Sequence, residues 1–293
     1  MEEYSDYITI GIPFYNAEKY LELSILSVIN QSHSRWELLL IDDGSTDNSL
    51  AVAKKYESLD KRIKVFSDGK NKKLASRLNQ IINLAKYDYI ARMDADDLIH
   101  PDRLKIQIDF LRNNLNFDLV SSGVVSIDNK NKVYGYRNVD EIKIGFNKLS
   151  RSYPEIVHAS ILAKKSWYVR NNYDTTYSRG QDYELWCRTS SQDDLKLAVL
   201  PDLLYYYREE GNLDVNRLIG NYENGFKTYK KYKNNTSITD LLKVKAKKYT
   251  VKIIDKLGFL QKIASRRNRK SIDYKVLSNH QKTVDSIIQN SEK

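Results

Sequence analysis

The chain has 293 residues, 41% of them apolar, with a formal net charge of +10, a composition that excludes a disordered or fibrous protein. No run approaches the roughly 18 uninterrupted apolar residues of a membrane-spanning helix, and the acidic N-terminus is unlike a secretory signal. The single cysteine, Cys187, excludes an intramolecular disulfide and fits a reducing compartment. We therefore expect a cytoplasmic protein in which Cys187 is a buried, unreactive thiol.

The positive charge is concentrated toward the C-terminus. From Val215 onward there are 19 Lys and Arg against 6 Asp and Glu, whereas residues 1–214 contain 29 against 32. This asymmetry predicts two regions, a slightly acidic one over residues 1–212 and a basic one over residues 213–293. Nucleic-acid binding is disfavoured, because the larger region is net acidic and no nucleic-acid-binding motif is present.

Strand and helix signals alternate along the first 125 residues. Short apolar runs predict strands at Tyr7–Ile12, Trp36–Asp42, Ile63–Phe66, Tyr89–Met93 and Leu119–Ile127. Helical spacing and start signals predict helices over Ala17–Gln31, from a cap at Ser45 or Asp47 to Leu59, over Lys73–Ala85, and from Pro101 to Asn113. This alternation is typical of a parallel α/β sheet with crossover helices.

The pattern is less regular beyond Pro154. Shorter strands and helices are expected in the segments HASILAKK, QDYELWCRT, LKLAVL and LYYYR. From about Asn216 the chain reads as helical, polar and rich in lysine. We find no internal repeat, and no linker long enough to separate this last region as a freely tethered unit.

Polar and acidic clusters follow three of the predicted strands. Pro13–Asn16 follows the first, Asp42–Asp47 the second and Asp94–Asp97 the fourth. Ligands of open parallel sheets bind beyond the carboxyl ends of the strands, and two acidic clusters at one edge repel each other unless a cation lies between them. A divalent cation that holds a diphosphate meets this requirement, and it would polarise the diphosphate as a leaving group.

Each cluster alone also has a structural explanation. Asp42–Asp47 could be a turn and a helix cap, and Asp94–Asp97 could be a Ca²⁺ loop, a phosphatase strand or part of a receiver domain. The segment lacks the glycine and the downstream glutamate of a Ca²⁺ loop. A phosphatase or a receiver domain would not explain the other motifs of the chain. The ordered pair of clusters therefore favours a site for a metal and a diphosphate.

Three segments resemble family-2 glycosyltransferases of the GT-A fold. The N-terminal part of the family resembles the segment IGIPFYNAEKYLELSILSVINQSHSRWELLLIDDGSTDNS. The stretch that leads into the family's Asp-x-Asp motif resembles ASRLNQIINLAKYDYIARMDADDLIHPDRL. The acceptor-side region of the family resembles VHASILAKKSWYVRNNYDTTYSRGQDYELWCR. The similarity covers roughly residues 7–210 and is greatest to bacterial enzymes that build capsule, O-antigen or exopolysaccharide. It implies a Rossmann-like α/β fold, with a mixed, mainly parallel sheet flanked by helices and a C-terminal helical tail.

The resemblance implies a donor site at the strand ends. Asp43 matches the position that accepts from the N–H of the base, and Asp94 and Asp96 match the Asp-x-Asp motif, with Asp96 the direct contact of Mn²⁺ or Mg²⁺. Asp97 matches a position close to the donor sugar. For Arg77, contact with the base or phosphates and a solvated helix position both stay open. The implied nucleotide-binding residues are Pro13, Tyr15, Asp43, Arg77, Asp94 and Ala95.

The resemblance also implies an acceptor side, with Asp182 as the catalytic base. Many family members have Glu-Asp where this chain has Gln181-Asp182, which leaves the base in place and the role of Gln181 open. A carboxylate beside the acceptor hydroxyl acts as a general base for direct displacement, which inverts the anomeric carbon. Asp182 could also cap the helix that follows. His158 is implied in acceptor or diphosphate contact and Trp186 against a sugar ring, with a structural hydrogen bond and core packing as the respective alternatives.

Two features lie outside these motifs. In Tyr205–Arg208, alternate tyrosines on a strand face opposite sides, so one of them could reach the site. Apolar residues from Thr250 to Ala264 recur at helical spacing among lysines and arginines. This pattern is typical of a helix that lies on an anionic membrane, and it equally fits a helix that packs on the catalytic region.

These observations predict an inverting glycosyltransferase that uses a nucleotide-diphosphate sugar, with UDP the first choice and dTDP and GDP still open. The expected acceptor is a saccharide or a lipid-linked saccharide. Two alternatives are a sugar nucleotidyltransferase, which would need a glycine-rich loop where Pro13–Asn16 stands, and a non-catalytic partner that binds a nucleotide sugar. The sequence leaves open the sugar, the linkage and the oligomeric state.

Overall fold

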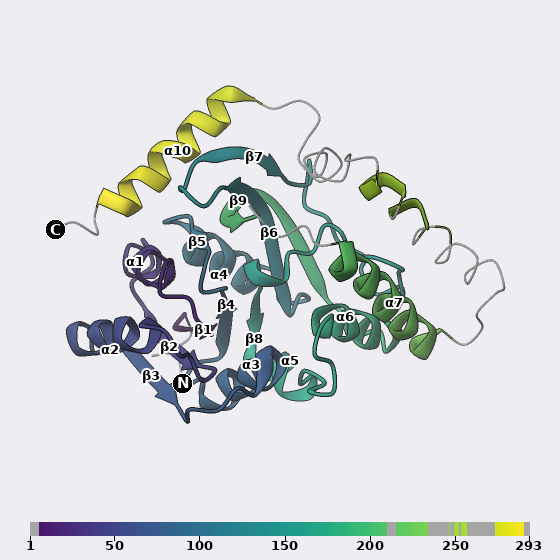
Figure 1. The fold of residues 1–293 in the computed structure, drawn as a ribbon, viewed down its shortest axis with the longest axis horizontal. Coiled ribbons are helices and arrows are strands. Elements are labelled where there is room, and N and C mark those ends of the chain that lie inside the picture. Colours follow the sequence, from purple (N-terminus) through teal and green to yellow (C-terminus); the bar gives the residue numbers. More distant parts are fainter. Residues whose placement is uncertain are drawn as a thin grey trace.

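The structure is a computed structural model that describes residues 6–209, 215–233, 246, 249–251, 253–256 and 273–289. One large mixed sheet runs through the described part, with helices against both of its faces (Figure 1). The strands are β1 (Ile8–Phe14), β2 (Trp36–Asp42), β3 (Ile63–Ser67), β4 (Tyr89–Arg92), β5 (Leu98–Ile99), β6 (Leu119–Ile127), β7 (Val133–Arg137), β8 (Leu162–Lys164) and β9 (Leu197–Arg208). The helices are α1 (Leu21–Ile29), α2 (Ser49–Leu59), α3 (Lys73–Leu84), α4 (Arg103–Asn113), η1 (His158–Ser160), α5 (Lys165–Arg170), α6 (Gln181–Ser191), α7 (Val215–Tyr232) and α10 (Tyr274–Gln289).

The strand order is β3-β2-β1-β4-β8-β6-β9-β5, and β7 pairs with β6. The first four strands in this order are parallel, as are β6 and β9, whereas β8 runs antiparallel to both of its neighbours. Short crossover connections with one helix each, as between β1 and β2, give the parallel half its order. The predicted mixed, mainly parallel sheet is therefore confirmed.

Several element boundaries differ from the predicted ones by a few residues. β2 and β6 lie where they were predicted, but α1 begins at Leu21 because the preceding segment is a turn in which Ala17 accepts the backbone N–H groups of Tyr20 and Leu21. The N-cap of α2 is Asn48, so the cap expected at Ser45 or Asp47 is wrong. Asp47 instead accepts the N–H of the first helical residue. Likewise, α4 begins two residues after Pro101.

The segments LKLAVL and LYYYR form one long strand, β9, rather than two. A register shift in its pairing with β6 accommodates Pro201, whose ring removes a ladder hydrogen bond. Asn138 donates to the carbonyl of Pro201 at 2.7 Å and so satisfies part of the irregular backbone. The strand can therefore continue to Arg208, which lies beside the end of β4.

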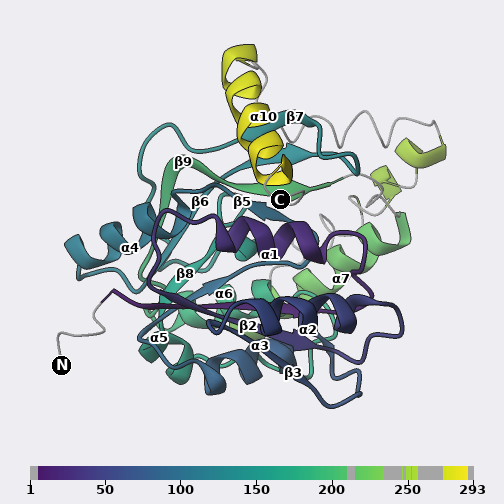
Figure 2. The same ribbon diagram turned by 90° about the vertical axis from the view of Figure 1, so that its left-hand side faces the viewer.

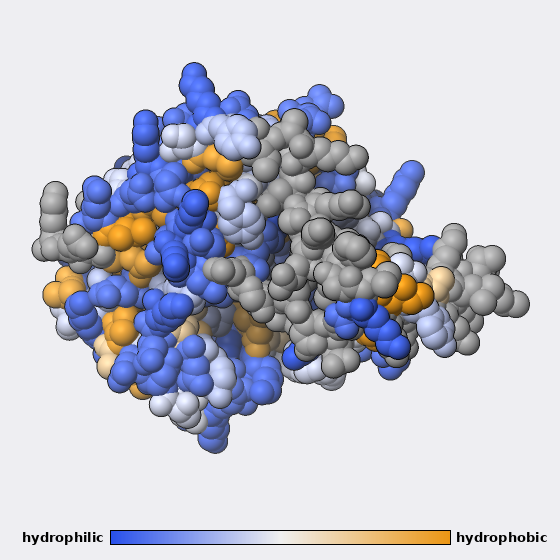
Figure 3. Space-filling model, turned by 45° about the horizontal axis from the view of Figure 1, so that its top comes forward, coloured by the Kyte–Doolittle hydropathy of each residue, from blue (hydrophilic) through white to orange (hydrophobic). Residues whose placement is uncertain are grey.

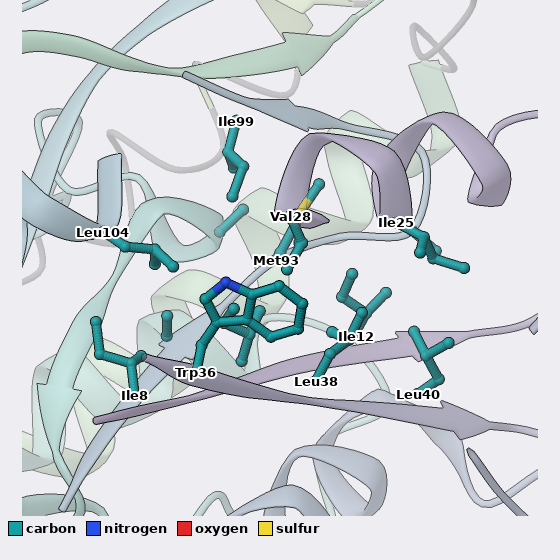
Figure 4. Packing of buried hydrophobic residues seen from close by; sticks show 14 of the residues in the cluster. Ile8, Ile12, Ile25, Val28, Trp36, Leu38, Leu40, Met93, Ile99 and Leu104 are labelled. Atoms are coloured by element: carbon teal, nitrogen blue, oxygen red, sulfur yellow. The ribbon is translucent and has the colours of Figure 1, made fainter. Parts of the chain in front are cut away.

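Both faces of the sheet are buried. Along β2, Leu38 and Leu40 belong to the core under α1 and α2, and Leu39 and Ile41 belong to the core under α3, α5 and α6. Figure 4 shows the first of these cores, in which Trp36 lies between the strands and α1. Strands covered on both faces read as continuous apolar runs, which explains why WELLLID could be assigned from the sequence. Cys187 is buried in the second core, as predicted, and burial raises the pKa of its thiol to about 12.

Two helices of the C-terminal region pack on the sheet domain. α7 lies against α6, and α10 covers β7 and the end of α1 (Figures 1 and 2). Val284 and Ile287 of α10 are buried in a third cluster with residues of β6 and β7. The predicted boundary at residue 212 falls among residues that the structure does not describe, so the division into two regions stays a prediction.

The predicted basic helix Thr250–Ala264 lies largely outside the described residues, which include only 250, 251 and 253–256 of it. Ile253 is 57% exposed there. Within the described part of the chain, every helix falls short of the length and apolarity that crossing a bilayer requires. The face seen in Figure 3 is mainly hydrophilic, with small separate apolar patches.

Candidate active site

The three polar clusters meet at one edge of the sheet. β1 lies between β2 and β4, and Phe14 pairs in register with Asp42. The N–H of Asp43 donates to the carbonyl of Phe14 at 2.8 Å, and the N–H of Met93 donates to that of Gly11 at 3.2 Å. The chain therefore leaves β2 and β4 on either side of the segment that follows β1, which confirms that the clusters share an edge.

Asp43 is held by a network that the sequence did not reveal. Its carboxylate accepts hydrogen bonds from the N–H groups of Lys72 (2.7 Å) and Lys73 (3.1 Å) and from Nε of Arg77 (2.8 Å). Arg77 is only 1% exposed, and it also donates to Asp68 at 2.7 Å and to the carbonyl of Lys70. The solvated position considered for Arg77 is therefore wrong. Its guanidinium fixes the carboxylate of Asp43 and the loop before α3.

The four residues Asp94–Asp97 have different environments. Asp94 is partly exposed and accepts a hydrogen bond from Nη2 of Arg92 at 2.7 Å. Asp96 is exposed at the surface, and its pKa is raised by desolvation and by the charge of Asp94. The side chain of Ala95 is buried and points into the first core. The exposed ligand candidates at the end of β4 are therefore Asp94 and Asp96.

Asp97 does not lie where the resemblance placed it. It is 1% exposed, and its two carboxylate oxygens accept from the hydroxyl of Tyr205 (2.8 Å) and from the N–H of Arg208 (2.7 Å). Desolvation, followed by the charges of Asp96 and Asp94, raises its pKa well above the ordinary value. The expected contact of Asp97 with the donor sugar is therefore corrected to a buried link between β4 and β9.

A divalent cation fits the exposed pair of carboxylates. Among the described residues, no group of three or more His, Cys, Asp or Glu side chains is arranged to hold a metal by itself. Mg²⁺ and related ions, however, are commonly held by one or two carboxylates together with substrate phosphates. Desolvation and then the negative charge of Asp94 raise the pKa of Asp96, and a bound cation would favour its charged form. Asp94 and Asp96 thus suit a metal that arrives with a diphosphate.

The end of β4 opens into a pocket of about 1050 Å³. Asp94 and Arg92 line it on one side, and Gln181 and Asp182 line it from the first turn of α6. The N-cap of α6 is Gly180, with φ of 74°, and so Asp182 is not the cap that we considered. As the second residue of the helix, it presents a half-buried carboxylate to the same pocket as Asp94.

His158 also lines this pocket but is mostly buried. Its Nε2 lies 2.7 Å from the hydroxyl of Tyr173. Desolvation, followed by the charge of Arg92, lowers the pKa of His158 well below its usual value. The imidazole is therefore neutral and held by a structural hydrogen bond, while its edge remains part of the pocket wall.

The remaining predicted residues lie apart from the pocket. Trp186 is 3% exposed and stacks on Trp167, so core packing accounts for it and the expected contact with a sugar ring is corrected. Pro13 is buried in β1, and Tyr15 beyond it is 50% exposed. Together with Asp43, which follows β2, these two residues lie at the ends of β1 and β2, outside the pocket. The predicted donor and acceptor residues therefore form two adjoining groups.

Sequence reasoning missed several residues of the pocket wall. Arg92 is 5% exposed, and its Nε is buried without a hydrogen-bond partner in the described structure. Tyr207, from the tyrosine run singled out in the sequence, lines the pocket, as does Arg137, which pairs with Glu209 at 2.9 Å. A further wall of the pocket comes from α7, for which no motif in the sequence provided a signal.

Comparison with known proteins finds glycosyltransferases among the relatives of this chain. The O-antigen biosynthesis glycosyltransferase WbnJ of Escherichia coli is 27% identical over 243 residues, which cover 81% of this chain and 93% of WbnJ. The UDP-Glc:alpha-D-GlcNAc-diphosphoundecaprenol beta-1,3-glucosyltransferase WfgD of Escherichia coli is 33% identical over 180 residues, which cover 61% of this chain and 68% of WfgD. Both relatives are glycosyltransferases.

A solved structure shares the fold. The crystal structure of S. aureus TarS residues 1–349 in complex with UDP superposes with a TM-score of 0.60 at 17% identity, over 80% of this chain and 68% of that chain. The model of the family described as Glycosyl transferase family 2 matches residues 9–170. That match spans more than half of the chain and includes the ends of β1, β2 and β4. The chain belongs to glycosyltransferase family 2.

Proposed function

We propose that this glycosyltransferase moves a sugar from a UDP-sugar to a saccharide or lipid-linked saccharide during synthesis of a bacterial surface polysaccharide. The names of similar proteins support this choice. WfgD is named for UDP-Glc as donor and for a GlcNAc-diphosphoundecaprenol acceptor, WbnJ for O-antigen biosynthesis, and the TarS structure contains UDP. The nucleotide would bind across the ends of β1 and β2, with Asp43 accepting from the base and Tyr15 beside it.

In the proposed transfer, the acceptor oxygen bonds to the anomeric carbon while the bond from that carbon to the diphosphate breaks. The carboxylate of Asp182 takes the proton of the acceptor hydroxyl. Attack from the side opposite to the diphosphate inverts the anomeric configuration. Asp94 and Asp96 would hold Mn²⁺ or Mg²⁺, which neutralises the charge of the leaving diphosphate.

One observation carries this proposal. Asp94, at the diphosphate end, and Asp182, in the first turn of α6, line the same open pocket. A reacting sugar between them has a leaving group on one side and a base on the other, as an inverting displacement requires. The neutral His158 in the same wall can donate or accept a hydrogen bond, and it adds no positive charge beside Asp182 or the diphosphate.

We also propose that the enzyme works at the inner face of the cell membrane. From Val215 onward the chain has 19 Lys and Arg against 6 Asp and Glu. Basic residues near an anionic bilayer each contribute about 1 kcal/mol of attraction. Such contact would keep the enzyme close to a lipid-linked acceptor.

Thermal unfolding with UDP, dTDP, GDP or CDP, each with and without Mn²⁺, tests the donor site. A nucleotide at 100 times its dissociation constant stabilises the native state by about 2.7 kcal/mol, and we expect this for UDP in the presence of Mn²⁺. Asp182→Asn should keep that stabilisation and lose transfer by about 10²- to 10⁴-fold. The matched variant Asp109→Asn changes an exposed aspartate on α4 and should behave as wild type. Full transfer by Asp182→Asn would refute the role of the base.

A further inference from the structure

One wall of the pocket is formed by α7, which follows the part of the chain matched by the family model. Tyr222, Phe226 and Tyr229 all line the pocket and are all partly exposed. Their spacings of four and three residues place them on one face of the helix. We call these three residues the aromatic face of α7.

The aromatic face is held in place from the other end of the helix. The hydroxyl of Tyr232 donates to the buried carboxylate of Glu184, and Lys231 lies 3.8 Å from Asp174. At Gly225 the helix packs on α6 at ordinary van der Waals distance, since an added Cβ would lie 3.7 Å from the ring of Tyr183. Glu184 and Tyr183 directly follow Asp182 in the sequence. The contacts that fix α7 thus involve the same turn of α6 that presents the proposed base.

Polar groups surround the three aromatic rings. The amides of Asn221 and Asn224 and the guanidinium groups of Arg151 and Arg179 line the same pocket. Arg151 also lies 5.8 Å above the ring of Tyr229. Small-molecule sites combine aromatic walls with a few polar groups that fix orientation. A sugar ring matches this combination, because its C–H face packs on an aromatic ring and its hydroxyl edge bonds to amides and guanidinium groups.

The location separates this surface from the nucleotide site. Asp43 and Tyr15, proposed to hold the base and ribose, lie outside the pocket, whereas Asp182 lies in it. The volume of about 1050 Å³ lies just above the roughly 300–1000 Å³ range of small-molecule sites. Such a pocket has room for the reacting sugar and for a further part of the acceptor. The uracil ring therefore has its own site, and the aromatic face remains for the acceptor.

We infer that the aromatic face of α7 binds the saccharide of the acceptor and determines which acceptors the enzyme uses. This inference rests on the proposed function, since it assigns a partner to the same pocket. It gives the region beyond the catalytic domain a direct part in substrate recognition, in addition to any contact with a membrane. Tyr222, Phe226 and Tyr229 are then specificity-determining residues, and the chemistry at Asp182 does not depend on them.

The test compares Tyr222→Leu and Phe226→Leu with wild type. Leucine keeps the apolar bulk of the helix face but removes the flat ring, so a residue that only packs loses little. The acceptor probes are GlcNAc-diphosphate carrying a short alkyl chain and a GlcNAc-terminated disaccharide, with UDP-sugars screened as donors. We expect KM for the acceptor to rise at least tenfold, with UDP affinity, donor hydrolysis and kcat at saturating acceptor within about twofold of wild type.

Tyr274→Leu is the matched control, because Tyr274 is 81% exposed on α10, outside the pocket wall. An unchanged acceptor KM in both α7 variants, or an equal rise in the control, would overturn the inference. Donor hydrolysis by wild type without transfer to either probe would also overturn it, since the saccharide would then not be recognised. Absence of both UDP binding and transfer in wild type would instead refute the proposed function.

Discussion

Replacing Arg77 with methionine should destabilise the protein and also weaken the proposed donor site around Asp43. Arg77 is 1% exposed and donates to Asp43 at 2.8 Å, to Gln80 at 2.8 Å, to Asp68 at 2.7 Å and to the carbonyl of Lys70. Methionine fills much of the same volume but donates no hydrogen bond. The substitution therefore removes the cation from beside a buried carboxylate.

The size of the effect follows from what each partner loses. Breaking a buried ion pair by removing one side typically costs about 3–5 kcal/mol, because the remaining charge is left uncompensated. Asp43 keeps two backbone N–H groups, from Lys72 and Lys73, which places the loss near the lower limit. The Asp68 contact adds little to this loss, because the carboxylate of Asp68 is exposed to screening by solvent. We expect a total of about 3 kcal/mol.

Urea unfolding of wild type, Arg77→Met, Asp43→Asn and the double variant measures this loss and the coupling between the pair. The double variant should lose at least about 1 kcal/mol less than the sum of the single changes. Arg35→Met is the control. Arg35 pairs with Asp6 but is 58% exposed, so its loss should change the free energy of unfolding little. UDP affinity with Mn²⁺ should fall at least tenfold in Arg77→Met. Wild-type stability together with unchanged UDP affinity would refute this account of Asp43.

Three further predictions address the metal, the C-terminal helix and the turn after β2. Asp96→Ala should abolish the Mn²⁺-dependent part of UDP stabilisation, and a retained dependence would exclude Asp96 as a ligand. Burial, followed by the charge of His100, lowers the pKa of His280 to about 4. His280 is therefore neutral while α10 is docked on the sheet domain, and it takes up a proton near pH 6.5 when the helix is released. Hydrogen-exchange protection of α10 should therefore fall as the pH drops from about 6.5 to 4, and His280→Gln should remove that dependence. Gly44→Ala should cost about 1–3 kcal/mol in urea unfolding, because φ is 76° and the new Cβ would lie 2.9 Å from the backbone of Lys70. Gly69→Ala, with φ of 67° but nothing within 4 Å, is its control and should cost less.

The strands and the shared edge of the acidic clusters could be predicted because they depend on local pattern. Trp36–Asp42 is apolar along its whole length, and a parallel order of strands brings their ends together whatever the side chains do. The environment of Asp97 depends on a different kind of information. Its partner Tyr205 is 108 residues away in the sequence, and nothing near Asp97 distinguishes it from Asp96. The same limit applies to the aromatic face of α7, since spacing defines a helix face but not what lies opposite it.

The distribution of arginines explains why two of the site's aspartates differ from the others. Asp43 is paired with Arg77 and Asp94 with Arg92, and Asp97 is closed off by Tyr205 and the backbone of Arg208. A carboxylate held by a buried cation is fixed in place and its negative charge is stabilised, which makes it a poor proton acceptor. Within the described ranges of the chain, the side chains of Asp96 and Asp182 have no ion-pair partner.

That difference supports the roles that we propose for Asp96 and Asp182. The exposed Asp96, whose pKa is raised by desolvation and by Asp94, gains most from a cation. Asp182 is half-buried in the pocket wall and has room beside it for a hydroxyl group. Asp43, by contrast, links the end of β2 to α3 through Arg77, and Asp94 is paired with Arg92 at the end of β4. Among the described residues, the fold thus pairs Asp43 and Asp94 with arginines and leaves Asp96 and Asp182 without an ion-pair partner. We assign proton transfer to Asp182 and the direct metal contact to Asp96, with the partly exposed Asp94 as the second ligand.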